Sequence, residues 1–365
     1  MNKALTVGLI AVFCLVTGFS YAADVAVDHK GSRAAAGYFT DESANPTFGV
    51  ADAKLRLNAK VDEMTSAVLR IDAPTMTLDY AYIQLDNVVS KLVPNLPINP
   101  VITAGKFKID FGEETWYNNP VEGALVFNSV ADVSGNDNGL MLKQNDFLKN
   151  MPLIFGYSLS FMNGATVAVD NNTNKAFSVK ATGQMKTMPL YFSLSYYSAT
   201  GIPCTVAQDA ALNVNGSMDG VAVNWSRKVF ELNARFDMIE GAAKFTPEKT
   251  PLFSESKGVF GLTYGTATDG EPVIGKITYG YVALSALYNV DPKMYVAFRY
   301  SYNDVAVDRN STLDGKFTRT QIGGGYKVSS NTTLKFEYTM DDEPDTALAA
   351  KVDNNKVALI VSTLW

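Results

Sequence analysis

The chain has 365 residues, with 31 Lys and Arg against 37 Asp and Glu, so its formal net charge is −6. This acidic balance gives no support for nucleic-acid binding, which uses basic surfaces. With only one histidine and two cysteines, the sequence excludes a disulfide-rich scaffold. Mean hydropathy is zero. Beyond the N-terminus no window approaches the roughly 18 uninterrupted apolar residues of a membrane-spanning helix.

Residues 1–22 have the features of a secretory signal peptide. Lys3 makes the start positive, Ala4 to Phe19 are largely apolar, and Ser20-Tyr21-Ala22 puts small residues where signal peptidase reads them. We therefore predict export, cleavage after Ala22 and a single mature domain over residues 23–365. Cleavage removes Cys14 and leaves Cys204 without an internal partner.

Apolar and polar residues alternate with a period of two along much of the mature chain. Residues 51–62 read ADAKLRLNAKVD, which a strand separates into two faces and a helix does not. The apolar members, which we expect to face outward, recur in the same way in four further runs: 105–111, 153–161, 230–238 and 294–303.

These runs are long for strands of a soluble sandwich, the alternative fold, because about ten residues are what a tilted strand needs to cross a bilayer core. Aromatic residues near the expected strand ends favour belts at the lipid–water boundary; they are Tyr196, Tyr197, Trp225, Phe230, Tyr279, Tyr281, Tyr288, Tyr295, Tyr300 and Tyr302. The sequence therefore predicts an all-β fold, a transmembrane antiparallel β-barrel.

The expected connections are of two kinds, which is typical of outer-membrane barrels with short periplasmic turns and long external loops. We expect short turns at 62–65, 226–229, 289–293 and 329–332, and long loops at 112–136, 199–216, 240–276, 304–314 and 341–353.

The alternation of the two rims constrains the number of strands. The strand at 50–62 runs toward the periplasm and needs an upward partner, for which Ser32–Phe39 is the candidate. Lys257–Thr266 looks like one strand, yet zero or two are required between residues 239 and 277. If this run belongs to a folded external loop the barrel has sixteen strands, and if it has a hidden partner, eighteen. We expect sixteen, because both termini then lie in the periplasm.

The chain ends on an alternating run, Val357–Trp365. It resembles the C-terminal strand of bacterial outer-membrane barrels, whose final aromatic residue is read by the barrel-assembly machinery. We therefore expect Trp365 to be a C-terminal assembly signal, and its strand to close the barrel against Ser32–Phe39. The inward phase of this strand is half apolar: Ala358, Ile360, Ser362 and Leu364.

Residues 48–138 contain three motifs in a characteristic order: ADAKLRLNAKVD at 51–62, DYAYIQL at 79–85 and ITAGKFKIDFGEE at 102–114. In order and spacing they resemble the phosphate-selective porin O/P family of bacterial outer-membrane porins. The resemblance implies a trimeric, sixteen-stranded porin with loops folded inward. Anion-selective members line the pore with Arg and Lys ladders, whereas this chain mixes charges of both signs.

The alternation assigns more cations than anions to the inward face. The expected pore-lining cations are Lys54, Arg56, Lys60, Arg70, Lys106, Lys108, Lys180, Arg235, Arg299, Arg319, Lys327 and Lys335. The opposing carboxylates are Asp52, Asp72, Asp110, Glu231, Asp237 and Glu337. This excess favours a modest anion preference, whereas pairing of the charges across strands would leave a weakly selective pore.

Loop 112–136 is the expected constriction. It contains Glu113, Glu114, Trp116 and Tyr117, and it continues into the apolar run Ala124–Phe127. An apolar run in a long loop needs a dry place to pack. Folding into the barrel against its wall provides one, and a neighbouring subunit is the alternative.

Nothing in the sequence points to an enzyme. His29 is the only histidine and lies in the N-terminal tail, and no metal-ligand spacing or phosphate-binding glycine loop occurs. We expect no catalytic residue, cofactor or metal.

Two functions remain. The first is a homotrimeric porin in outer-membrane lipid that passes small hydrophilic solutes or anions. The second is a non-conducting structural or adhesive barrel whose external loops bind partners.

Overall fold

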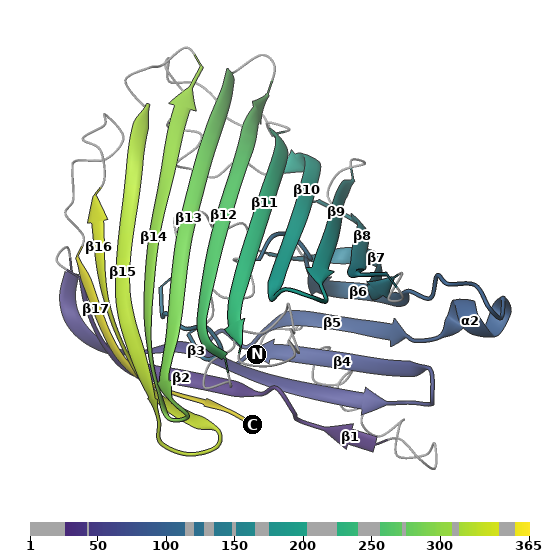
Figure 1. Ribbon diagram of the computed structural model, residues 1–365, viewed down its shortest axis with the longest axis horizontal. Helices are drawn as coiled ribbons and strands as arrows, with labels where there is room; N and C mark the ends of the chain where they lie inside the picture. Colours follow the sequence, from purple (N-terminus) through teal and green to yellow (C-terminus); the bar gives the residue numbers. More distant parts are fainter. Residues whose placement is uncertain are drawn as a thin grey trace, which may run out of the picture.

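The computed structural model describes residues 26–41, 44–113, 120–127, 135–147, 151–164, 175–202, 225–239, 256–271, 275–308, 314–342 and 355–365. The predicted signal peptide and Cys204 lie outside this part of the chain. Strands β2 to β17 follow one another around an antiparallel barrel (Figure 1). Within the described residues, no helix is long and apolar enough to span a membrane.

The strands are β1 (Ala26–Asp28), β2 (Arg33–Asp41), β3 (Ala44–Lys60), β4 (Thr65–Asp72), β5 (Thr77–Leu85), β6 (Val101–Lys108), β7 (Asn136–Phe147), β8 (Leu153–Met162), β9 (Ala176–Met185), β10 (Leu190–Ile202), β11 (Trp225–Ile239), β12 (Ser256–Glu271), β13 (Gly275–Asp291), β14 (Met294–Val307), β15 (Gly315–Lys327), β16 (Thr332–Asp342) and β17 (Lys356–Leu364); the helix α2 (Val88–Leu92) lies between β5 and β6.

The barrel is closed between its last and first wall strands. β17 pairs with β2 from Lys356 opposite Asp41 to Leu364 opposite Arg33. The backbone N–H of Trp365 then donates to the Ser32 carbonyl at 2.9 Å, and the Gly31 N–H donates to the Trp365 carbonyl at 2.7 Å. The predicted closure against Ser32–Phe39 is thus confirmed. The short strand β1 continues beyond β2 along the same edge of β3.

Side chains sort by phase into an apolar outer face and a largely polar inner face. On β11, Glu231, Asn233 and Arg235 are buried, while Leu232 and Phe236 are exposed. This is the reverse of a soluble protein and is typical of a barrel surrounded by lipid. The predicted aromatic belt is wrong for three of its members, which face inward and are buried: Tyr197, Tyr281 and Tyr295.

The prediction of sixteen wall strands is confirmed, but two of the segment assignments on which it was based are wrong. Residues 226–229 are the start of β11 and form no turn. Residues 257–266 belong to the wall strand β12, hydrogen-bonded to β11 and β13, and not to a folded external loop. Because the turn was misplaced, β11 was assigned the opposite direction. With that direction a single strand between β11 and β13 could not fit the alternation of the rims, so β12 was taken for part of a loop.

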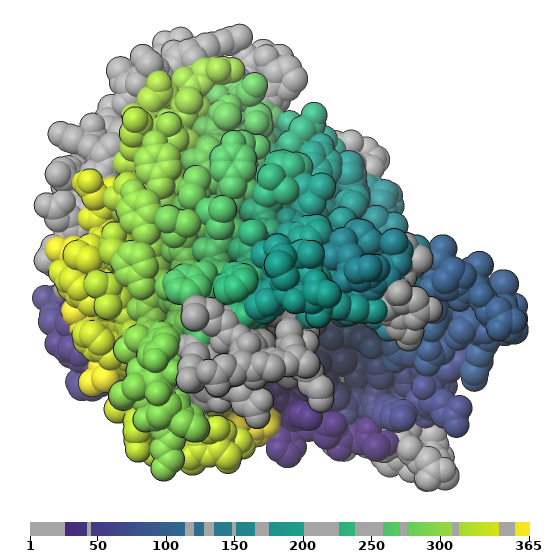
Figure 2. All heavy atoms as spheres, viewed as in Figure 1, coloured from purple at the N-terminus to yellow at the C-terminus, as the bar shows by residue number. Residues whose placement is uncertain are grey.

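Connection lengths follow the predicted asymmetry between the two rims only in part, because the rim of long loops also has the short connections 42–43, 73–76 and 272–274. The rim of short turns includes residues 61–64, 186–189 and 328–331 between strands. The connection 86–100 on this rim is longer and carries α2, which projects from the barrel (Figures 1 and 2). β11 also ends, and β12 begins, at this rim, so the connection 240–255 leaves and re-enters there.

The closing register yields a direct test. Ala36 lies opposite Val361, and directly opposite residues in an antiparallel pair have Cα atoms about 4.5–5.5 Å apart, within the range of a disulfide. In a Cys204→Ser background, Ala36→Cys with Val361→Cys should form an intramolecular disulfide that changes gel migration without reductant. Ala36→Cys with Leu359→Cys, two residues out of register, should form far less, and equal yields would contradict the register.

Candidate functional site

The predicted pore-lining residues divide into two groups. Ten lie in the inward phase: Lys54, Arg56, Lys60, Arg70, Lys180, Arg235, Arg299, Arg319, Lys327 and Lys335. Lys106 and Lys108 were assigned wrongly. Phe107 between them is buried inside the barrel with Ile109 and Phe111, and the Lys106 ammonium donates to the Leu78 carbonyl on the outer side.

The reason for this error is that β6 has an apolar inner face. Phe107, Ile109 and Phe111 pack against Tyr197 and Tyr281 on the opposite part of the wall. Alternation shows that two faces differ, but not which of them meets lipid.

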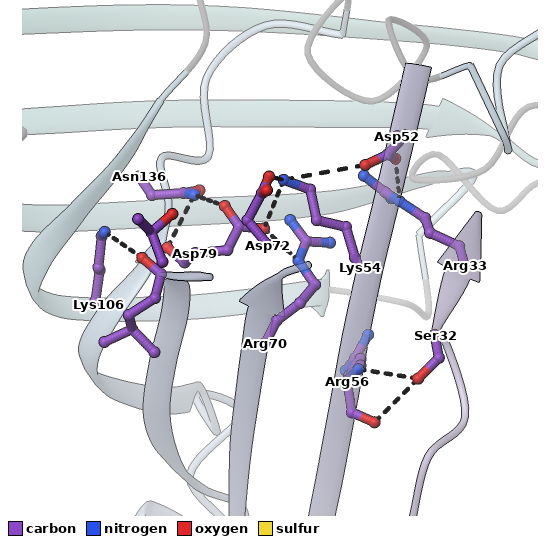
Figure 3. Close-up of polar contacts among 12 residues, drawn as sticks. Ser32, Arg33, Asp52, Lys54, Arg56, Arg70, Asp72, Asp79, Lys106 and Asn136 are labelled. Carbon is purple, nitrogen blue, oxygen red and sulfur yellow. Dashed lines mark hydrogen bonds and ion pairs between the residues drawn. The ribbon is translucent and has the colours of Figure 1, made fainter. Parts of the chain in front are cut away.

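A charged ladder lines the inner wall of β2 to β5 (Figure 3). Its members are Arg33, Asp52, Lys54, Arg70, Asp72 and Asp79. Arg33 Nε lies 2.5 Å from Asp52 Oδ2, and Arg70 Nε lies 2.5 Å from Asp79 Oδ2. Lys54 stands between these pairs, bonded to Asp72 and 3.8 Å from Asp79. Asp52 is buried, and the other five side chains keep partial solvent access, so most of the ladder faces the lumen.

The register of the ladder explains its pairing. Lys54 is directly opposite both Arg33 on β2 and Asp72 on β4. Arg56 is directly opposite Arg70, an unfavourable pair of like charges. The two guanidinium groups turn apart: Arg70 binds Asp79 and lies over the Tyr80 ring, whereas Arg56 donates to Asn58 Oδ1 at 2.7 Å. Arg56 therefore makes no ion pair with a described carboxylate, although the Asn58 hydrogen bond and, more weakly, the charge of Arg56 lower the pKa of Asp28 on β1.

Residues 110–113, at the start of loop 112–136, are held by buried charges. Lys143 and Lys180 lie 2.9 and 3.4 Å from the Asp110 carboxylate. Lys180 also lies 3.0 Å from Glu113 Oε1. Burial alone would raise the pKa of Asp110, but the two ammonium groups outweigh it and hold this pKa well below its usual range.

Gly112 has a backbone conformation suited to this buried position. Its φ is +57°, and a Cβ there would lie 2.2 Å from Glu231 Oε1. The Gly112 N–H donates to Ser195 Oγ at 3.0 Å, and its carbonyl accepts from Lys180 at 2.7 Å. The glycine in the motif at 102–114 is thus required for the chain to pass close to the wall.

Residues 120–127 of the same loop are bound to the inner wall by a clamp, formed by Lys335 and Glu337 on β16. The Lys335 ammonium donates to the carbonyls of Pro120, Val121 and Gly123 at 2.8, 2.7 and 2.7 Å. The Glu337 carboxylate accepts from the backbone N–H groups of Val126 and Phe127. The clamp satisfies backbone groups that would otherwise be buried without partners.

Other wall residues complete the attachment of this segment. The Tyr295 hydroxyl donates to the Ala124 carbonyl at 3.0 Å, and Arg299 and Gln321 donate to the Phe127 carbonyl at 2.6 and 2.9 Å.

The apolar side chains of the segment cover the apolar inner face of the last strand. Val121 and Val126 form a buried cluster with Ala35, Ala358 and Ile360. The apolar run in the loop and the half-apolar phase of β17, two separate features of the sequence, are therefore the two sides of one contact. Of the other loop residues singled out from sequence, Glu114, Trp116 and Tyr117 lie outside the described residues.

Sequence reasoning missed several inner-wall charges. Arg33 lies on β2, whose alternation is weak, and Asp79 follows a register shift between Arg70 and Ile71. Asp341 lies in β16, although the sequence assigned it to the loop 341–353, and Lys356 begins β17 just before the predicted run Val357–Trp365. Lys143 lies in β7, for which no alternating run was identified. Arg33 also joins wall to loop, because its Nη1 lies 3.1 Å from Glu122 Oε2.

Most inner-wall cations in the described part of the chain are neutralised. Arg235 pairs with Asp237 on its own strand, and Arg319 pairs with Asp341, which also lies 3.2 Å from Lys356. Arg56 and Lys60 make no ion pair with a described residue. No group of three or more His, Cys, Asp or Glu side chains in these ranges is placed to hold a metal.

Comparisons with known proteins identify the fold. No family model and no curated protein matches the chain. OmpT, an outer membrane protein of Vibrio cholerae, is 14% identical with a TM-score of 0.64, covering 93% of this chain and 98% of that one.

Two further solved structures agree. The outer membrane channel DcaP of Acinetobacter baumannii is 12% identical with a TM-score of 0.61, covering 94% and 98%. The anion-selective porin from Comamonas acidovorans is 12% identical with a TM-score of 0.58, covering 94% and 100%. The chain therefore has the fold of bacterial outer-membrane β-barrels, with short periplasmic turns and long external loops.

The clamp predicts a specific effect of one substitution. Lys335→Met keeps the volume but leaves three buried carbonyls without donors, so we expect the free energy of unfolding in lipid vesicles to fall by about 3 kcal/mol or more. Lys60→Met, at an exposed position without a described partner, is the control and should change stability by less than about 0.5 kcal/mol. Equal urea midpoints for the two variants would show that the clamp does not hold the segment.

Proposed function

We propose that this chain is a bacterial outer-membrane porin that allows passive diffusion of small hydrophilic solutes. The observation that carries the proposal is the division of the lumen. Loop residues 110–113 and 120–127 are attached to β7, β9–β11 and β14–β16, while the charged ladder on β2–β5 keeps solvent access. The described part of the loop thus narrows the lumen, the role expected of a constriction loop, and it meets the ladder at Arg33, which pairs with Glu122.

The fold of the chain supports this proposal. A barrel with an apolar outer face and a polar inner face is suited to connect two aqueous compartments across lipid. One structural neighbour is an outer membrane channel and another an anion-selective porin, which makes conduction the function to test first.

We infer at most a modest anion preference. Ladder charges of opposite sign bind one another, so their fields largely cancel along the pore. The remaining positive charge comes from Arg56 and Lys60, which lie toward the periplasmic end of β3. The resemblance to phosphate-selective porins rests on the three motifs of residues 48–138, and two cations of the third motif, Lys106 and Lys108, lie in the phase opposite to the buried Phe107.

Planar-bilayer recording tests both proposals. The purified protein should insert as conducting channels, and the reversal potential in a KCl gradient should lie slightly toward the anion side. Arg56→Gln should move it toward zero, because one unpaired pore cation is lost. Lys106→Gln, the matched change on the outer face, should leave it unchanged.

Two results would contradict these expectations. A folded barrel that conducts nothing would favour the alternative, a structural or adhesive barrel whose external loops bind partners. A clearly cation-selective wild type, or an equal shift in both variants, would overturn the anion preference.

We further propose that the chain forms a homotrimer through the outer face of β2–β5. β4 and β5 have 8 and 9 residues, against 15 to 17 in β11–β13. These lengths are at or below the lower limit for crossing the bilayer core, for which about 9–11 tilted residues are needed. The same face carries two of the most exposed apolar side chains of the described wall, Phe48 and Val50. One neighbour, OmpT of Vibrio cholerae, has been solved in a trimer form.

Size measurement of the detergent-solubilised protein tests this interface. Val50→Gln should shift the mass measured by light scattering from three chains toward one. Val296→Gln, on the outer face of β14, should leave it at three chains. A monomeric wild type would contradict the trimer, and a trimer in both variants would place the interface elsewhere.

The route to the membrane completes the proposal. We infer export by the signal at residues 1–22, and insertion by the barrel-assembly machinery reading Trp365 at the end of β17.

A further inference from the structure

Beneath the loop, the inner wall of β11–β14 contains a notch. One row of directly opposite residues runs Arg235, Gly261, Ser285 and Arg299 across the four strands. The two small residues lie side by side between the two arginines, so the wall is recessed there. A Cβ at Gly261 would lie 2.5 Å from Ser285 Oγ, which shows how fully even a methyl group would fill this floor.

The notch is roofed and becomes a pocket. Leu125 of the loop packs with Val259, Leu287 and Ala297 of the adjoining row in one buried apolar cluster. The pocket is lined by these residues together with Arg235, Arg299, Gly261, Ser285 and Glu113. Most of the lining residues lie in the inward phase of β11–β14 or in the loop, so the pocket belongs to the lumen.

One buried polar atom in this pocket lacks a partner. The Glu113 carboxylate is only 4% exposed. Its Oε1 accepts from the Tyr191 hydroxyl at 2.6 Å and pairs with Lys180. Its Oε2 is buried and accepts no hydrogen bond from any described residue. Buried acceptors are generally satisfied, and none of the described residues supplies the donor here.

The charges around the pocket restrict the chemical class of ligand that could supply this donor. A ligand cation would meet the guanidinium groups of Arg235 and Arg299. A ligand anion would meet the Glu113 carboxylate. An uncharged hydroxyl avoids both conflicts, because its hydrogen can be donated to Glu113 Oε2 while its oxygen accepts from a neighbouring donor.

We propose that the pocket binds a small uncharged alcohol or phenol, with the hydroxyl on Glu113 and the apolar body between Leu125 and the notch. The site goes beyond passive diffusion, because it would retain one class of solute within the lumen. Binding requires the pocket and not a conducting pore, so it is measured separately from conductance.

Fluorine NMR of the full mature protein in nanodiscs tests the proposal. The probes are 4-fluorophenol and 4-fluoroanisole, which has the same ring but no O–H to donate. The wild type should bind 4-fluorophenol saturably and at least tenfold more tightly than 4-fluoroanisole. Glu113→Gln should reduce this preference.

Substitutions that fill the notch with a larger side chain test whether the ligand binds there. Gly261→Val should weaken 4-fluorophenol binding at least tenfold, and so should Ser285→Leu, which fills the same space if the first variant folds poorly. Gly280→Val is the matched control, since a Cβ at Gly280 meets no atom within 4 Å. Non-saturable signals, equal binding in all variants, or equal affinity for the two probes would overturn the proposal, whether or not the protein conducts.

Discussion

Satisfying a loop backbone inside the barrel is the constraint on which the rest of the lumen depends. Residues 120–127 have no regular secondary structure, yet their carbonyl and N–H groups are removed from bulk water. Lys335 binds three of those carbonyls and Glu337 binds two of the N–H groups. Because buried backbone groups are costly when unpaired, these wall residues determine where the loop can lie.

The position of the loop determines in turn which wall charges meet solvent. Lys180, Arg299, Lys335 and Glu337 are buried because they bind loop residues. The ladder on β2–β5 is left to border the open lumen. Inner-wall charges in this protein are therefore of two kinds, those that hold the loop and those that border the rest of the lumen, and a sum of charge over the whole inner face overstates the field in the lumen.

Local pattern predicted much of the barrel. The period-two runs located six of the sixteen wall strands, β3, β6, β8, β11, β14 and β17. The closing pair β17–β2 followed from the directions of the strands alone. The same reasoning failed at β12, because a turn was placed inside β11, where Ser226-Arg-Lys interrupts the apolar pattern. It also failed at β6, where the apolar side chains were expected to face lipid. Instead, Phe107 and Ile109 pack inside the barrel, and Lys106 and Lys108 lie on the opposite face.

What the sequence by itself determined was the strand, the period and the closed antiparallel wall, since alternation is a property of neighbouring residues. Only the tertiary structure decided which charges pair and which remain, because pairing depends on register between strands and on a loop distant in sequence. Val121 and Val126 meet Ala358 and Ile360 across more than half of the chain. An apolar loop run and an apolar strand face each look unfavourable alone in a polar lumen, and the fold removes both from water by placing them together.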